Sequence, residues 1–332
     1  MPIITDRVSV LNVFAEAKRN GWVIPAFGTE NLTTTEAVLA TVKEHGETCD
    51  CLNLPVMLAV TNCYPQRTQT AYYTQTRDWR IGLELFLADL AVLTGPDSPF
   101  AHLRVLVHLD HIQHDLDAKL WEGDLSRFSS IMFDASTLPF EENVAFTRKF
   151  MDQRQSEIVI EGACDYVGTK NNPLTQVEEA ERFAGETGVD WVVANLGTEH
   201  RAGASSLCYA RDRAREISAK IGQRLVLHGT SSVAIEQWPN LFSDGIVRVN
   251  LWTALERDSA GPLLRDMVHH AAKVVGSLTA AELLNEGLLG AHADTQSPAM
   301  LSHFTTAWRQ QLVFEQMKHI VKRYLEAWYP QV

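Results

Sequence analysis

The sequence predicts an α/β protein, a (β/α)8 TIM barrel with a C-terminal helical extension. Eight short apolar runs, each typical of a buried strand, are spread over residues 22–250, and segments with helical spacing separate most of them. Several runs end in an acid, a histidine or an asparagine, and parallel barrels carry their functional residues at these strand ends. Because eight strands recur in this way, a closed barrel is favoured over an open sheet.

The predicted strands are rich in Val, Ile and Leu without polar alternation, as expected for parallel strands that are covered on both faces. They span residues 22–27, 55–61, 105–111, 130–134, 157–161, 190–197, 225–228 and 245–250. Helices are predicted over residues 31–47, 83–90, 139–154, 177–187 and 210–221. Asn31 and Thr33 provide polar side chains that can cap the first of these helices.

A further helical segment, residues 300–328, follows the barrel. It has helical spacing and no strand pattern, and Phe304, Trp308 and Leu312 are available for packing. We therefore expect a catalytic barrel over residues 1–288 and an extension over residues 289–332, packed on the barrel or on a neighbouring subunit. The plainer alternative is a helix that only covers the barrel core.

Charge and cysteine content exclude several classes of protein. The net charge of −12, with no basic run, argues against binding to nucleic acid or to an acidic membrane surface. No apolar run approaches the roughly 20 residues of a membrane helix, and the N-terminus lacks a signal-peptide pattern. Five scattered cysteines form neither a disulfide framework nor a zinc motif, so we expect a reduced, cytoplasmic enzyme.

Polar residues at the strand ends predict a metal site. The strand ends of a barrel meet at one mouth, and His111, His200 and His228 would give three nitrogen ligands with an open position, as in catalytic zinc sites. A single histidine is more often structural, but three at this edge favour metal binding. Asp110 would move a proton, and Asp134 and Glu161 would orient the ligands or hold a second cation.

The loops after the last two strands predict an anion site. Gly229 and Ser231 follow the seventh strand, and Asn250 and Thr253 lie at the end of the eighth. Barrels commonly bind phosphate with these loops, through backbone N–H groups and hydroxyls. Glycine and serine also form ordinary turns, so the prediction depends on their placement at both loops.

Taken together, these stretches resemble the class II, metal-dependent ketose-bisphosphate aldolases, which include the fructose- and tagatose-bisphosphate aldolases. The resemblance covers roughly residues 20–260. The matching stretches are residues 24–27, 107–111, 133–143, 187–190, 197–200, 225–229 and 249–250.

The resemblance implies a zinc-dependent lyase. Its metal ligands would be His111, His200 and His228, with Asp134 and Glu161 as further metal-site carboxylates. Asp110 would be the acid/base, and zinc, or another divalent ion such as cobalt or manganese, would stabilise an enediolate. No lysine lies at these strand ends, which separates this chemistry from that of Schiff-base aldolases. We expect a phosphorylated sugar or an analogue as substrate and a homodimer or homotetramer as assembly.

The departures from the family pattern fall on the substrate loops. Arg201 replaces a glycine, Gly229-Thr230-Ser231 replaces a Gly-Gly-Ser-like loop, and residues 165–170 lack the usual glutamate and glycine pair. We therefore expect retained aldol chemistry on an altered substrate. The guanidinium of Arg201 suits a phosphate, carboxylate or sulfonate, and the alternative is a pair with a surface acid.

Two other functions remain open on the same scaffold. A metal-dependent sugar isomerase or epimerase would give a product with the carbon count of its substrate. A non-catalytic aldolase-like subunit would not need to keep Asp110 and the three histidines, so their presence counts against it.

Overall fold

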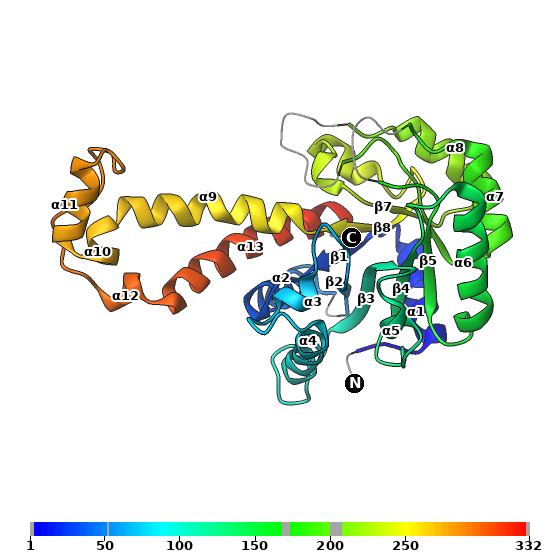
Figure 1. Cartoon of the computed structure of the whole chain (residues 1–332), viewed down its shortest axis with the longest axis horizontal. Coiled ribbons are helices and arrows are strands. Elements are labelled where there is room, and N and C mark those ends of the chain that lie inside the picture. The colour runs from blue at the N-terminus through cyan, green and yellow to red at the C-terminus, as the bar shows by residue number, and fades with distance from the viewer. Residues whose placement is uncertain (1–2, 52, 168–172, 200–207, 330–332) are drawn as a thin grey trace.

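The computed structural model describes residues 3–51, 53–167, 173–199 and 208–329. Eight parallel strands follow one another around a closed barrel, and β8 pairs with β1. The predicted (β/α)8 barrel with C-terminal helices is therefore confirmed (Figure 1). The strands are β1 (Ile24–Gly28), β2 (Pro55–Thr61), β3 (Arg104–Gln113), β4 (Ser130–Asp134), β5 (Val159–Ala163), β6 (Trp191–Val193), β7 (Leu225–Leu227) and β8 (Ile246–Leu251).

Helices surround the barrel. The predicted cap of α2 is present, because the backbone N–H of Thr34 donates to Asn31 Oδ1 at 3.1 Å. Helix α1 was not predicted; Asp6 caps its start and Gly21, with φ of 71°, ends it. These helices are α1 (Arg7–Asn20), α2 (Leu32–Thr48), α3 (Gln69–Tyr72), α4 (Trp79–Leu93), α5 (Ala118–Trp121), α6 (Phe140–Arg154), α7 (Val177–Thr187) and α8 (Arg211–Ile221).

The burial of the strands identifies the functional edge. Every residue of β1, β2 and β4–β7 is buried, as expected for strands packed between a barrel interior and outer helices. In β3 and β8 the pattern is interrupted near the carboxyl end, where Asp110 and Asn250 are half-buried. Both of these residues line a pocket at the barrel mouth.

After β8 the chain forms a long helical arm. Figure 1 shows α9 and α13 running side by side away from the barrel, with α10 to α12 at the far end. These helices are α9 (Thr253–His269), α10 (Ala271–Val275), α11 (Ser277–Asn285), α12 (Leu301–Phe304) and α13 (Thr306–Trp328). The predicted division at residue 288 lies within this arm, between α11 and α12, and remains a proposal. No helix in the described ranges is both long and apolar enough to cross a membrane.

Candidate metal and active site

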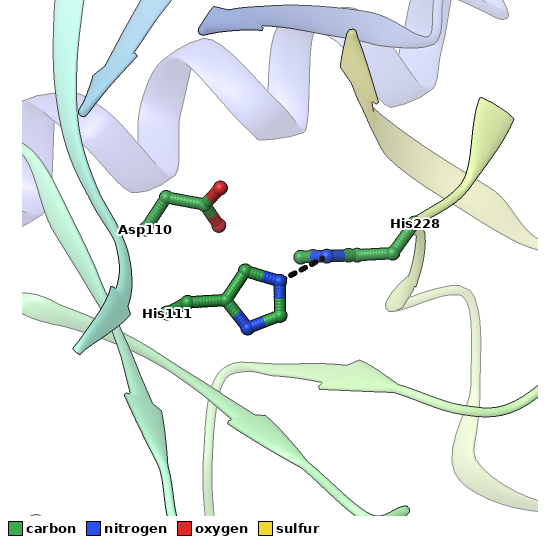
Figure 2. Close-up of side chains that lie close together, drawn as sticks. All are labelled: Asp110, His111 and His228. Carbon is green, nitrogen blue, oxygen red and sulfur yellow. Dashed lines mark hydrogen bonds between the residues drawn. The ribbon is translucent and has the colours of Figure 1, made fainter. Parts of the chain in front are cut away.

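Three side chains from two strand ends converge at the mouth of the barrel. Asp110 and His111 lie on β3, and His228 follows β7 directly. One ligand atom from each lies within 4.8 Å of the other two. Figure 2 shows the three side chains directed toward a common space, and all three line the pocket.

A backbone irregularity in β3 places two consecutive residues in this pocket. The pairing of β3 with β4 shifts register between Leu109 and Ile112, and His111 has a φ of 49°. A regular strand points successive side chains to opposite faces, whereas Asp110 and His111 both line the pocket. A bulge of this kind redirects a side chain, and the left-handed backbone of a non-glycine residue is kept only where its surroundings hold it.

Contacts on several sides fix the ring of His111. Its Nδ1 lies 2.7 Å from Asp134 Oδ2, and Tyr64 stacks on the ring with centroids 4.3 Å apart. Ser136 donates to the other oxygen of Asp134 through N–H (3.1 Å) and hydroxyl (2.6 Å). Burial alone would raise the pKa of Asp134, but His111 and Ser136 lower it to about 2. The ionised carboxylate therefore accepts the Nδ1 proton and leaves a lone pair on Nε2.

A buried ion pair orients the second ring. His228 Nε2 lies 3.2 Å from Glu161 Oε1, and Arg248 donates to the other oxygen of Glu161. The side chains of Glu161 and Arg248 are both fully buried. Burial would raise the pKa of Glu161, but Arg248 and then His228 hold it below its ordinary value. Ionised Glu161 is able to accept an Nε2 proton from His228, and Asn250 Nδ2 lies at the same distance, 3.2 Å, from this nitrogen.

The two remaining ring nitrogens face each other. His111 Nε2 and His228 Nδ1 are 3.1 Å apart and form a hydrogen bond, so one of them carries a proton (Figure 2). Where Asp134 and Glu161 accept the outer ring protons, a divalent cation between the rings would replace that shared proton. Neutral imidazole nitrogens beside a carboxylate are ligands that suit zinc and neighbouring divalent transition metals. These residues therefore fit such an ion.

Asp110 is held as an ionised carboxylate next to this pair. Asn250 Nδ2 donates to its Oδ1 at 2.9 Å, whereas His108 Nε2 is 3.7 Å away. Burial would raise the pKa of Asp110, but His111, His108 and His228 hold it well below its usual range. An ionised carboxylate at the pocket surface is able to accept a proton from a bound substrate.

The structure brings most of the predicted site residues together. Asp110, His111, His228, Asn250, Gly229, Ser231 and Thr253 all line one pocket. Asp134 and Glu161 lie behind the two rings as their hydrogen-bond partners, and neither belongs to the ligand cluster found among the described residues. His200 and Arg201 lie outside the described residues. Arg248 was missed, although an arginine between two valines in the middle of an apolar strand is a signal for a buried ion pair.

Gly229 is required at its position because the chain turns tightly there. Its φ is 66°, and an added Cβ would lie 2.8 Å from backbone atoms of Glu199. Gly188 also has a positive φ, of 73°, but nothing lies within 4 Å of an added Cβ. We expect Gly229→Ala to lower the free energy of unfolding by about 3 kcal/mol, and Gly188→Ala by about 1 kcal/mol. Urea unfolding measures both variants. Equal losses of stability would show that the close approach to Glu199 does not add to the cost of the substitution at Gly229.

A second ionic cluster lies beside the pocket, between the ends of β1, β2 and β8. Arg67 donates to Glu30 through Nε (3.1 Å) and through Nη2, and Gln69 Nε2 donates to Glu30 Oε1 at 3.2 Å. Burial and then Glu30 raise the pKa of Glu256 to about 7. Arg67 also lies over the rings of Tyr72 and Trp252, 4.5 and 5.9 Å from their centroids.

The raised pKa of Glu256 predicts a pH-dependent stability. The folded state binds the proton of the Glu256 carboxyl more tightly than the unfolded state does. The stability that this protonation contributes is therefore lost as pH rises from about 4.5 through about 7. At pH 8 the free energy of unfolding of Glu256→Gln should therefore exceed that of the parent protein by roughly 2 kcal/mol. At pH 4.5 the two proteins should be about equally stable. Urea unfolding at both pH values measures the difference. The exposed Glu282→Gln is the control, and a gain independent of pH would contradict the assignment.

A closed parallel barrel with a histidine–carboxylate cluster at the carboxyl ends of its strands is an arrangement that metal-dependent barrel enzymes use. A family model described as class-II fructose-bisphosphate aldolase matches residues 8–282. The match covers most of the chain, so the chain belongs to the class-II fructose-bisphosphate aldolase family. The resemblance identified from the sequence is confirmed.

Solved aldolase structures share the fold over nearly their full length. Fructose-bisphosphate aldolase (Fba) from Campylobacter jejuni is 15% identical with a TM-score of 0.75, covering 98% of this chain and 95% of that one. The YdjI aldolase from Escherichia coli K12 is 16% identical with a TM-score of 0.64, covering 99% and 98%. A putative fructose-1,6-biphosphate aldolase from Coccidioides immitis is 20% identical with a TM-score of 0.65, covering 97% and 96%. At these identities the likeness concerns the fold.

Proposed function

We propose that the chain is a zinc-dependent aldehyde-lyase that cleaves or forms a ketose phosphate, or a related ketose, through an enediolate. The observation that carries the proposal is the pair of facing imidazole nitrogens, 3.1 Å apart, beside ionised Asp110. Membership of the class II aldolase family supports a lyase reaction on a phosphorylated sugar or an analogue.

The residues of the pocket have separate roles in this proposal. His111 and His228 would hold the divalent metal, together with His200. When bound, the metal would supply positive charge that polarises the donor carbonyl and offsets the charge developing as the carbon–carbon bond breaks. Asp110 takes the hydroxyl proton in cleavage and returns it in condensation, and Asn250 keeps its carboxylate in place.

The carboxylates behind the rings complete the metal site. We assign Asp134 and Glu161 first to orientation of His111 and His228, because each already accepts a hydrogen bond from a ring. Direct ligation of the metal or of a second cation by these carboxylates is the alternative assignment. Either role makes both carboxylates necessary for full metal affinity.

The donor phosphate would bind at the loops after β7 and β8. Gly229 and Ser231 line the pocket, and Thr253 begins α9, a helix of 17 residues. Among the described residues no side chain caps the N-terminus of α9, which supports an anion bound at its first N–H groups. Arg201 would add a guanidinium to the same group.

Aldehyde release from ketoses tests the function. Phosphorylated and unphosphorylated ketoses are offered to the purified protein with and without a chelator, and the products are followed by mass spectrometry. We expect two shorter products from a ketose phosphate, loss of the reaction with chelator, and recovery with zinc. A product with the carbon count of its substrate would instead indicate an isomerase or epimerase.

We also propose a cytoplasmic homo-oligomer, a dimer or tetramer, in which the arm contacts a neighbouring subunit. The free cysteines of the structure support a reducing compartment. The arm exposes large apolar side chains to solvent: Leu264 (64%), Leu278 (84%), Leu288 (67%) and Leu301 (72%). Apolar surface gathered on a projecting arm is typical of a subunit interface.

Light scattering coupled to size-exclusion chromatography tests the arm contact. Leu278→Asp combined with Leu301→Asp should shift the protein toward monomer, because the charges would be buried in the interface. Val92→Asp, on the equally exposed surface of α4, is the control and should leave the mass unchanged. An unchanged mass in the double variant would exclude the arm from the interface.

A further inference from the structure

The pocket has one cationic residue on its β1–β2 side. Gly28, Thr61, Arg67 and Gln69 line this side. Among the described residues that line the pocket, Arg67 is the only arginine, and no lysine is present. A phosphate bound at this side of the pocket would therefore depend on Arg67 within the described part of the chain.

Arg67 is already neutralised by carboxylates. Glu30 holds it through two hydrogen bonds, and the Glu30 side chain is only 7% exposed. The hydrogen bond from Arg67 to Glu30 raises the pKa of Arg67, and Glu256 adds a second negative charge nearby once the pH is above its own pKa of about 7. Capture of Arg67 by a phosphate would leave the buried carboxylate of Glu30 without its cationic partner and with only the hydrogen bond from Gln69, which is unfavourable. The cluster is therefore poorly suited to an anion.

Unpaired polar atoms where β8 adjoins β1 define what would bind instead. Among the described residues, Asn250 Oδ1 and Trp252 Nε1 are buried without a hydrogen-bond partner, and both residues line the pocket. Asn250 Oδ1 is an acceptor, which a phosphate dianion, itself only an acceptor, cannot satisfy. Hydroxyl groups both donate and accept, so they can satisfy both atoms. The faces of Tyr64 and Trp252 add apolar surface to the same pocket.

We infer that this side of the pocket binds the uncharged, hydroxyl-bearing end of a ketose monophosphate and discriminates against a second phosphate. The inference rests on the proposed function, because it takes the donor phosphate to lie at the loops after β7 and β8. Glu30, Arg67 and Trp252 set this preference. The substrate class is thus a ketose phosphorylated at the donor end only.

Binding of non-cleavable hexitol phosphates tests the preference separately from the reaction. A hexitol 1-phosphate and a hexitol 1,6-bisphosphate are titrated calorimetrically into the zinc-loaded protein. We expect the monophosphate to bind about tenfold more tightly, the effect of one unfavourable charge contact. Tighter binding of the bisphosphate would overturn the inference, and so would failure of both ligands to bind. Since these ligands lack a carbonyl, absence of aldolase turnover would count against the proposed function alone.

Removal of the neutralising carboxylate should change the selectivity. In Glu30→Gln the guanidinium of Arg67 becomes available, and the ratio of the two Kd values should move about tenfold toward the bisphosphate. At pH 8, where Glu256 is ionised, Glu256→Gln should move the ratio in the same direction, and this variant replaces Glu30→Gln in the test if Glu30→Gln does not fold. Glu16→Gln, which removes a similar two-bond pair with Arg104 away from the pocket, should not change it. An unchanged ratio in a folded Glu30→Gln or Glu256→Gln variant would contradict the inference.

Discussion

Replacement of Asp110 by asparagine is expected to lower kcat about 10³-fold while the bound metal is retained. Asparagine keeps the size of the side chain and can still contact Asn250, but it cannot accept a proton from the substrate hydroxyl. Turnover of a ketose phosphate and metal content, both measured on the same preparation, test this expectation.

The matched control is Asp115→Asn, a carboxylate five positions further along the chain whose side chain is 61% exposed. It changes the net charge by the same amount and should leave kcat and metal content unaltered. Retained metal together with unchanged turnover in Asp110→Asn would remove Asp110 from the mechanism.

Loss of Arg248 is expected to produce the largest effect on stability. Arg248→Met leaves the carboxylate of Glu161 fully buried without its cationic partner, which should lower the free energy of unfolding by about 3–5 kcal/mol. Because Glu161 also accepts a hydrogen bond from His228, we expect metal affinity to fall by roughly 10- to 100-fold. Urea unfolding and a competitive chelator titration measure the two quantities.

A double variant separates the charge from the geometry. Arg248→Met combined with Glu161→Met removes both charges, so it should recover much of the lost stability without recovering metal affinity. The exposed pair between Arg127 and Glu84 supplies the control, since Arg127→Met should cost less than about 1 kcal/mol. If Arg248→Met were no more harmful than Arg127→Met, the buried pair would have no role in stability or in the orientation of His228.

The barrel and much of the site could be predicted from the sequence because their signals are local. Buried parallel strands appear in the sequence as continuous apolar runs. Such runs are interrupted or ended at the functional edge by Asp110, His111 and Asn250. Strand order in a barrel then places distant strand ends at one mouth, which explains the shared pocket of His111 and His228.

Features that depend on pairing across the barrel could not be predicted in the same way. Arg248 and Glu161 are 87 positions apart, and the sequence around either residue does not indicate that the other is its partner. The cluster of Arg67 and Glu30 joins two loops whose conformations have no periodic pattern. The arm begins at Thr253, directly after β8, and in the described part of the chain no later strand follows to mark where the helices leave the barrel.

The most direct measurement for the whole account is the metal content of the purified protein and of its histidine variants. Plasma mass spectrometry should find about one divalent transition-metal ion per chain in the parent protein. His111→Ala and His228→Ala should each lose it, while His319→Ala on the exposed surface of α13 should keep it. Full metal content in both site variants would contradict a shared ion between His111 and His228, and with it the proposed lyase.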